Sequence, residues 1–361
     1  MHLFAKLSAS LIHTPSRLLA GVVLAACLLP GAAGAATATP PGPVTDGNGY
    51  RYYAIGDLAA ATPGPVEPGL MLVGGGEWPY DAFRWMIERA GHGHLVVLRA
   101  SGAAEAQDEF YREIGGVASA QTFVFSDRKA ASDPAVLATL EAADGIFIAG
   151  GDQANYVRYW KDTPLNAVLD RHVRDGKPLG GTSAGLAILG AWSYGAMDGG
   201  SITSQVALRD PLDPGMTLVG EFLHLPLLGQ VITDSHFAKR DRLGRLVAFV
   251  AKLRGEGVEV AGLGIDEGAA LCIDGAGVAR LYPGAQDGFA WLVQATQPPT
   301  RVERGQPLEF GAVRVTGIGA GSRLQLPGLE VQSPAFEKIA TASQGKLLLR
   351  DAAPAAPAAT R

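Results

Sequence analysis

The sequence predicts an α/β fold in which helices cover both faces of a mostly parallel sheet, followed by a β-rich C-terminal extension. Between residues 70 and 189, short apolar runs alternate with stretches whose apolar residues recur at helical spacing. This alternation is typical of parallel strands that are buried on both faces. The chain has 361 residues, 47% hydrophobic and 18% charged, which is enough for a sizeable core in one large or two ordinary domains.

Each expected element follows from a local pattern. Short apolar runs predict strands at 70–73, 94–98, 122–125, 145–149, 177–180, 230–233 and 260–265. Apolar residues three or four positions apart predict helices at 80–90, 106–114, 134–142, 165–173, 186–189 and 238–254. From 269 to about 350 the pattern shortens to strands and turns, which we interpret as β-rich decoration of the same sheet rather than a free domain.

The N-terminus has the three-part pattern of a secretory signal. Basic residues precede an apolar run at 18–29, and small residues follow it. The run is short for a membrane span, so we expect a signal peptide over 1–35, a flexible linker over 36–48, and a secreted or periplasmic protein without stable membrane insertion. Cys27 also fits a bacterial lipoprotein box, but the apolar residues after it favour cleavage over lipidation.

The remaining boundaries follow from composition. We expect an α/β domain over 49–274, a β-rich part of the same domain over 275–350, and a disordered tail over 351–361, where alanine and proline dominate. Removal of the signal leaves Cys272 as the single cysteine, so the mature chain cannot form an internal disulfide. The net charge of -5 and the lack of a long basic run argue against nucleic acid as a partner.

Gly181-Thr182-Ser183-Ala184-Gly185 fits the G-x-S-x-G pattern between an expected strand and an expected helix. A sharp turn there would lift the Ser183 hydroxyl clear of the sheet, and the helix behind it would direct free N–H groups toward a developing oxyanion. Ser183 is therefore a candidate nucleophile. The alternative is a glycine-rich turn in which Ser183 only caps the helix.

A serine nucleophile needs a base, and five histidines follow the expected signal: His92, His94, His172, His224 and His236. His92 and His94 flank a glycine and fit a solvated turn. His172 has charged neighbours and fits a surface position, whereas His224 lies in an apolar stretch and fits a buried structural role. His236 follows a strand end beside an acid, so we favour it as the base over helix capping or packing.

The third group should orient the imidazole and stabilise its cation. Asp266 and Glu267 end a later strand, and adjacent residues of an extended segment point to opposite sides, so only one of them can face the site. We favour Glu267. Asp198, in a glycine-rich loop, stays open as a second candidate.

Further polar and glycine-rich groups follow other strand ends. N–H groups of Gly150 or Gly151, together with that of Ala184, could form an oxyanion hole, and Gln153 could bind a substrate; the alternative is an ordinary left-handed turn that needs glycine. The same ambiguity holds for Gly74-Gly75-Gly76, which has no catalytic group beside it in the sequence.

Arg240, Arg242 and Arg245 follow His236 on the expected helix. A solvated or salt-bridged flank explains arginines at such places, and we keep that interpretation for Arg242. Arg240, one turn from His236, could instead hold a substrate carboxylate through a bidentate pair.

Four segments occur in register: Phe147-Ile148-Ala149-Gly150-Gly151-Asp152-Gln153, Gly180-Gly181-Thr182-Ser183-Ala184-Gly185, Asp234-Ser235-His236-Phe237 with the three arginines, and Gly264-Ile265-Asp266-Glu267. Together they resemble the cyanophycinase family, part of a wider group of serine peptidases that includes aspartyl dipeptidase. The resemblance runs from about residue 70 to 274.

The resemblance implies a class I glutamine amidotransferase-like fold with serine in place of the nucleophilic cysteine. It implies Ser183 as nucleophile and His236 as base, and it places Gln153, Asp234, Arg240, Arg245 and Glu267 around the substrate. The implied activity is exo-cleavage of cyanophycin to β-aspartyl-arginine dipeptides, with no metal or cofactor. Ser235 stands where the family commonly has glutamine, so a contact to the substrate differs here.

We therefore expect a secreted serine exopeptidase that acts on cyanophycin or related aspartyl peptides through an acyl-enzyme. The alternatives are another aspartyl or isoaspartyl dipeptidase, an esterase of the α/β-hydrolase type, and a binding protein that has lost catalysis. The sequence leaves open whether the chain forms a homodimer.

Overall fold

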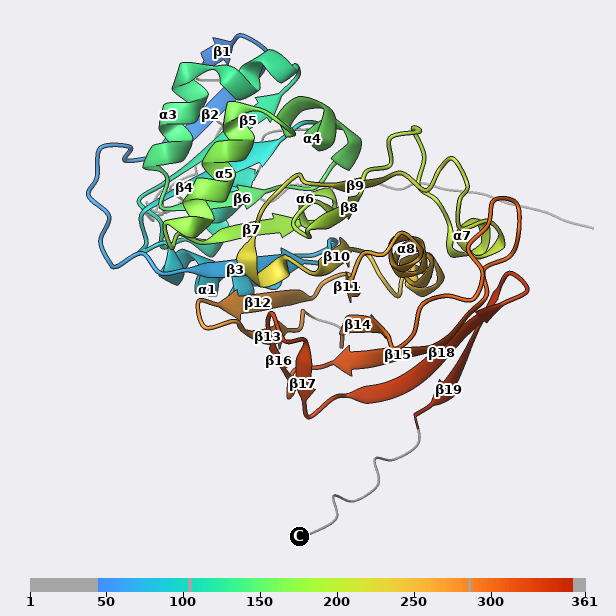
Figure 1. Ribbon diagram of the computed structural model, residues 1–361. Coiled ribbons are helices and arrows are strands. Elements are labelled where there is room, and N and C mark those ends of the chain that lie inside the picture. The colour runs from blue at the N-terminus through green and yellow to red at the C-terminus, as the bar shows by residue number, and fades with distance from the viewer. Residues whose placement is uncertain (1–44, 103–105, 285–286, 353–361) are drawn as a thin grey trace, which may run out of the picture. The chain divides into compact units, whose positions relative to one another are not determined.

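Two β-sheets carry the architecture of the computed structural model, which describes residues 45–102, 106–284 and 287–352 (Figure 1). The expected signal peptide, Cys27, most of the expected linker and most of the expected tail lie outside the described residues. Within the described ranges, no helix is both long enough and apolar enough to cross a bilayer.

The first sheet has 11 strands. They are β1 Thr45–Gly47, β2 Tyr50–Gly56, β3 Gly69–Val73, β4 His94–Arg99, β5 Ser119–Phe125, β6 Gly145–Ile148, β7 Leu179–Thr182, β12 Ala270–Asp274, β13 Val278–Tyr282, β16 Arg323–Gln325 and β17 Glu330–Gln332. Their order is β1-β2-β5-β4-β6-β7-β3-β12-β13-β16-β17. The five central strands from β5 to β3 are parallel, and antiparallel strands extend both edges.

The second sheet has 8 strands. They are β8 Trp192–Tyr194, β9 Leu218–Gly220, β10 Val231–Asp234, β11 Ala261–Ile265, β14 Ala290–Ala295, β15 Phe310–Ile318, β18 Phe336–Ser343 and β19 Lys346–Asp351. Their order is β19-β18-β15-β14-β11-β10-β8-β9, in which β8, β10 and β11 are parallel and the other pairs are antiparallel.

Most of the helices follow the expected pattern. They are α1 Tyr80–Arg89, α2 Ala106–Asp108 continued by the π-helix η1 Glu109–Ile114, the 3₁₀ helix η2 Arg128–Ser132, α3 Pro134–Ala142, α4 Gln153–Trp160, α5 Pro164–Arg174, α6 Ala184–Ala187, α7 Ser204–Arg209, the 3₁₀ helix η3 Pro226–Leu228 and α8 Leu243–Gly255. Helices α4 and α7 were not predicted from the sequence. The helix expected from residue 238 begins at Leu243 instead, because residues 238–242 form turns that carry Arg240 and Arg242.

Two expectations about organisation are wrong. The β-rich region does not extend one sheet: β12, β13, β16 and β17 join the first sheet, whereas β14, β15, β18 and β19 join β10 and β11 in the second. The antiparallel pairing of β12 with β3 occupies the edge of the first sheet, so β10 and β11 pair elsewhere. The expected linker is also shorter, because residues 45–47 form β1 and pair with β2.

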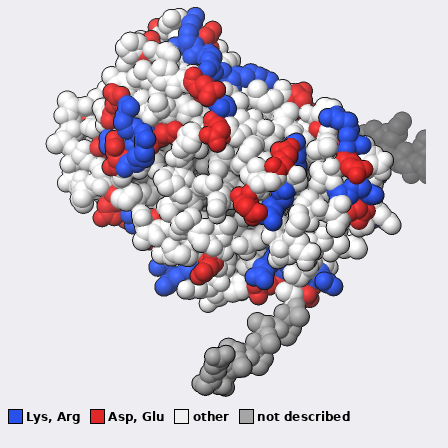
Figure 2. All heavy atoms as spheres, in the orientation of Figure 1, with Lys and Arg blue, Asp and Glu red and all other residues white. Residues whose placement is uncertain are grey.

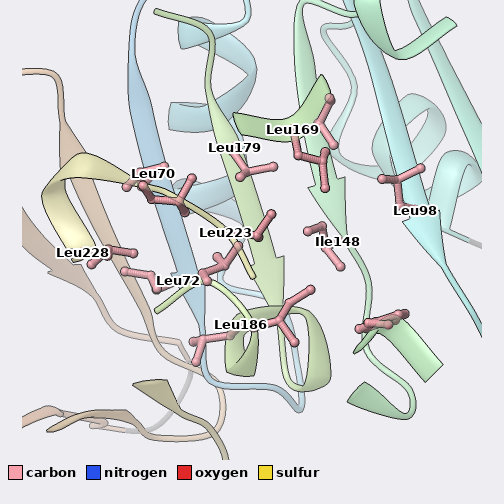
Figure 3. Packing of buried hydrophobic residues seen from close by; sticks show 14 of the residues in the cluster. Leu70, Leu72, Leu98, Ile148, Leu169, Leu179, Leu186, Leu223 and Leu228 are labelled. Atoms are coloured by element: carbon pink, nitrogen blue, oxygen red, sulfur yellow. The ribbon is translucent and has the colours of Figure 1, made fainter. Parts of the chain in front are cut away.

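Helices cover both faces of the parallel strands, which confirms the predicted α/β class, although both sheets are mixed rather than mostly parallel. Alternate strand residues point to opposite faces: Met71 and Val73 pack with Phe83 of α1 on one side. Leu70 and Leu72 join the cluster on the other side, with helices α3, α4 and α5. Figure 3 shows this second cluster, in which Leu70, Leu72, Leu98, Ile148, Leu169, Leu179, Leu186, Leu223 and Leu228 are labelled.

The same cluster joins the two sheets. Leu263 of β11 and Leu292 of β14 belong to the core that also holds Leu72 of β3. Helix α8 covers the opposite face of the second sheet, where Phe249 packs in a separate cluster with Val315 of β15 (Figure 1). The two sheets are therefore held together by apolar contacts rather than by strand pairing.

Strand ends of both sheets meet at one place. The Ser183 N–H, after β7, donates to the Val73 carbonyl at the end of β3 at 3.1 Å. The His236 N–H, after β10, donates to the Gly74 carbonyl at 2.7 Å. Because ligands of parallel sheets bind beyond the carboxyl ends of the strands, this meeting point is the expected place for chemistry.

Candidate active site

Ser183 occupies a sharp turn between β7 and α6. Its backbone has φ 54° and ψ -114°, a strained conformation for a residue other than glycine. The glycines beside it allow close packing: a Cβ on Gly185 would lie 2.1 Å from the Ile148 carbonyl oxygen. Both features are those of a nucleophile elbow, in which the hydroxyl stands clear of the sheet.

The structure brings Ser183, His236 and Glu267 into one hydrogen-bonded row. The Ser183 Oγ lies 2.7 Å from the His236 Nε2, and the His236 Nδ1 lies 2.6 Å from the Glu267 Oε1. A hydroxyl, an imidazole and a carboxylate in this order allow the ring to accept the hydroxyl proton while the carboxylate stabilises the resulting cation.

The glycine-rich turn after β3 supports the imidazole. A Cβ on Gly75, whose φ is +94°, would lie 2.3 Å from the His236 Cε1, so only glycine fits beneath the ring. A Cβ on Gly76 would lie 3.3 Å from the Glu267 Cβ. This role was not predicted from the sequence, because the turn and His236 are far apart in the chain. A run of three glycines at a strand end was the available signal.

Electrostatics favour a neutral imidazole and an ionised carboxylate. Burial lowers the pKa of His236, with Arg240 and Arg242 acting in the same direction, although the hydrogen bond to Glu267 opposes them. Burial alone would raise the pKa of Glu267, but hydrogen bonds from Lys239 and His236 outweigh it and hold the pKa below its ordinary value. His236 is therefore available as a base at neutral pH.

Asp266 and Asp198, the two other candidates for the carboxylate that contacts His236, have other contacts. Asp266 is buried, and its carboxylate accepts hydrogen bonds from the Ala238 N–H, the Phe289 N–H and the Trp291 indole N–H. Asp198 lies beside Gly215, whose added Cβ would be 2.9 Å from its Oδ2. The carboxylate that meets His236 is that of Glu267.

The structure corrects our interpretation of three other histidines. His172 is buried rather than on the surface, and it contacts the Pro178 carbonyl at 3.0 Å, because it lies on the apolar side of α5. The side chain of His224 is 60% exposed rather than buried, since it points away from the core between Leu223 and Leu225 and contacts Asp170 and Glu221. His92 lies in an exposed turn as expected, but His94 begins β4 and is half-buried, with its ring nitrogens 2.7 Å from the Ser119 Oγ and 2.9 Å from the Ala60 carbonyl.

A cavity of about 330 Å³ opens at Ser183 and His236. Its remaining lining residues are Gly151, Asp152, Gln153, Ala154, Arg158, Ala184, Ala187, Tyr194, Ala196, Gly199, Gly200, Ser201, Asp234, Ser235, Arg240, Arg242 and Arg245. The candidate oxyanion and substrate-binding residues are thus gathered around the hydroxyl. Gly150 lies behind it, since its added Cβ would be 3.3 Å from the Ser183 Cβ.

Asp234 and Arg245, which both line this cavity, form a buried ion pair. The guanidinium is bidentate, with Nε 2.8 Å from Oδ2 and Nη2 2.5 Å from Oδ1, and Arg245 also stacks on the Tyr194 ring. Gln153, from α4, donates to the Tyr194 carbonyl at 3.3 Å. Asp234 therefore orients the Arg245 guanidinium.

Arg242 is salt-bridged to Asp234, one of the two interpretations we expected, but it is buried rather than on a solvated flank. It donates to the Ser235 carbonyl at 2.7 Å and shares Asp234 with Arg245. The turn before α8 directs it inward, and burial lowers its pKa to about 10, so it remains charged at neutral pH. Ser235 lies beside it, with Oγ 3.4 Å from the Arg242 Nη1.

The cavity has an excess of positive charge. Arg158, Arg240, Arg242 and Arg245 line it, against Asp152 and Asp234. Arg240 is half-exposed, and its Nε lies 3.9 Å from the Glu267 Oε1. On the molecular face in Figure 2, by contrast, basic and acidic side chains are intermingled. No group of three or more His, Cys, Asp or Glu suited to a metal ion occurs within the described ranges.

The fold and this row of side chains define a serine-type peptidase. The sequence model of peptidase family S51 matches residues 103–281, close to half of the chain, in agreement with the resemblance of its motifs. Cyanophycinase of Trichormus variabilis is 29% identical over 221 residues, which cover 58% of this chain and 69% of that protein. Cyanophycinase of Thermosynechococcus vestitus is 33% identical over 190 residues, covering 52% and 54%.

Two solved structures are also similar. A peptidase from an acI-B1 actinobacterium has a TM-score of 0.47 and 17% identity, covering 73% of this chain and 98% of that one. A putative peptidase E protein from Listeria monocytogenes has a TM-score of 0.36 and 16% identity, covering 58% and 95%.

Proposed function

We propose that this protein is an exopeptidase that hydrolyses cyanophycin or related aspartyl peptides to β-aspartyl-arginine-type dipeptides through an acyl-enzyme. The observation that carries the proposal is the Ser183–His236–Glu267 row at the edge of an arginine-lined cavity. An exopeptidase must recognise a chain end, and a terminal carboxylate is the natural partner of a guanidinium.

In the proposed reaction, His236 accepts the Ser183 proton as Oγ attacks the carbonyl carbon of an aspartyl amide. Glu267 stabilises the imidazolium, and the N–H groups of Gly151 and Ala184 hold the oxyanion. His236 then gives the proton to the leaving amine, which departs and leaves an ester on Ser183. Water, activated by His236, hydrolyses that ester and restores the hydroxyl.

The arginines support the choice of substrate class. The Arg240 guanidinium is half-exposed at the cavity and can form a bidentate pair with a carboxylate of the substrate. The buried Arg242 adds positive charge that Asp234 compensates only in part, because the same carboxylate also pairs with Arg245. A substrate end with more than one carboxylate would neutralise the remaining positive charge of these arginines.

The decisive experiment uses the purified protein and the S183A variant. We expect the protein to release β-aspartyl-arginine from cyanophycin, identified by mass, and S183A to fold normally but release none. Short α-aspartyl and β-aspartyl peptides and simple esters, tested in parallel, separate this activity from those of other dipeptidases and esterases. Unchanged hydrolysis by S183A would refute the assignment.

We also propose that the protein is secreted or periplasmic. The support is the signal pattern of residues 1–35, which predicts cleavage after Ala35. Cell fractionation and N-terminal sequencing of the mature protein test this: a mature chain that begins at Ala36 is expected, a lipid on Cys27 would contradict the cleavage site, and an uncleaved chain in the cytoplasm would contradict export.

A further inference from the structure

We propose that Trp291 is a positioning residue for the active site, acting through Asp266 on the turns that carry His236 and Glu267. The inference rests on the proposed function of that row of residues. It assigns a role to β14, which lies beyond residue 281, where the match to the family ends.

Asp266 joins the two catalytic turns to β14. Its Oδ1 accepts the Ala238 N–H at 2.9 Å and the Trp291 Nε1–H at 3.0 Å, and its Oδ2 accepts the Phe289 N–H at 3.0 Å. Ala238 is two residues after His236, and Asp266 directly precedes Glu267. The buried Asp266 carboxylate therefore fixes the positions of His236 and Glu267 relative to β14.

Backbone contacts make this connection stiff. The Phe237 N–H donates to the Ile265 carbonyl at 3.2 Å, and the Asp266 N–H donates to the Phe289 carbonyl at 3.0 Å. The His236 turn, the Glu267 turn and the start of β14 thus form one hydrogen-bonded unit. A shift of the Asp266 carboxylate would move both ends of the His236–Glu267 hydrogen bond.

Aromatic packing holds the Trp291 ring in place. Its centroid lies 5.6 Å from that of Phe237, next to His236, and 4.8 Å from that of Phe336 in β18. A Cβ on Gly264 would lie 2.3 Å from the Phe237 ring, so Phe237 is confined between β11 and Trp291. The C-terminal strands therefore support the residue that follows the catalytic base.

The W291F variant isolates the indole N–H because it keeps an aromatic ring in the same packing. We expect Asp266 to lose one of its three donors and the two turns to loosen. Since small misplacements of catalytic groups are costly, the expected loss is roughly tenfold in kcat, with KM unchanged. Loss of the Glu267 hydrogen bond lowers the pKa of His236, so the acidic limb of activity should move to lower pH.

Other charged groups at the site stay in place in this variant. Lys239 and Arg240 face Glu267, at 3.0 Å from Oε2 and 3.9 Å from Oε1, and Arg242 acts on His236. A moved acidic limb in W291F therefore reports the His236–Glu267 contact. W85F, on α1, is the matched control, and we expect it to behave as the wild type.

The rate at which a fluorophosphonate labels Ser183 measures activation of the hydroxyl without any choice of peptide. We expect W291F to label roughly tenfold more slowly than the wild type and W85F at the wild-type rate. D266N, which replaces the shared acceptor, should lose at least as much. If D266N does not fold, the labelling rate of W291F alone tests the inference.

The outcomes are separable. A W291F protein with a lower Tm but the wild-type labelling rate and pH profile would show a structural role only, and would overturn the inference. A higher KM with unchanged labelling would also overturn it, because Trp291 would then act on the substrate. A wild-type protein that does not label at all would refute the proposed function itself, and this inference with it.

Discussion

Glu267→Gln tests the electrostatic part of the mechanism. The Glu267 Oε1 lies 2.6 Å from the His236 Nδ1, so an ion pair forms when His236 accepts the Ser183 proton. With charge centres about 4 Å apart and an effective dielectric constant of about 20, the attraction is about 4 kcal/mol. Since about 1.4 kcal/mol corresponds to tenfold in rate, its loss would lower kcat by about 10³-fold.

Two features of the structure reduce the expected loss of kcat. The Glu267 side chain is 20% exposed, and Lys239 already pairs with its other oxygen. We therefore expect a decrease of roughly 10²- to 10³-fold in kcat. The assay compares initial rates of dipeptide release at saturating substrate, with E303Q, an exposed glutamate, as the control. If E267Q keeps more than about a tenth of the wild-type kcat, the charge of Glu267 does not matter as argued.

Three further predictions follow from the packing. G75A should lower kcat by about 10²-fold, because the added methyl displaces the His236 ring; dipeptide release measures it. D234N should lower the free energy of unfolding by about 3 kcal/mol or more in urea titrations, because it leaves the buried Arg245 without a charged partner. Burial lowers the pKa of His172 to about 4, so stability should fall as pH drops from about 6.5 towards 4, and H172Q should remove this slope.

Each of these has its own control. G176A adds a methyl at a similar positive φ of +78° with nothing within 4 Å, so it should leave kcat unchanged. An unaltered urea midpoint in D234N would contradict the assigned role of the ion pair. As the pH falls, the unfolded chain binds a proton at His172 before the folded chain does, so the folded state loses stability. A stability that rises on acidification would contradict the burial argument.

The sequence was informative about the parallel strands and about which turns carry polar groups. The order of apolar runs and helices predicted the strands from β3 to β7, because each element is defined by local spacing. The G-x-S-x-G turn and the strand ends at His236 and Glu267 placed the candidate residues at one edge. The opposite orientation of adjacent side chains also separated Glu267 from Asp266.

What could not be predicted depends on contacts between distant segments. The division into two sheets follows from the pairing of β12 with β3, which no local pattern indicates. The contact of Gly75 with His236 joins residues 161 positions apart (236 - 75). The burial of His172 and exposure of His224 depend on the direction of one side chain in each segment, which neighbouring residue types indicated wrongly.

The catalytic contact crosses the boundary between the two sheets. Ser183 follows a strand of the first sheet, whereas His236 and Glu267 follow strands of the second. Because each sheet supplies only part of the catalytic row, neither sheet alone can activate the Ser183 hydroxyl. Hydrolytic activity therefore requires that the two sheets pack against each other.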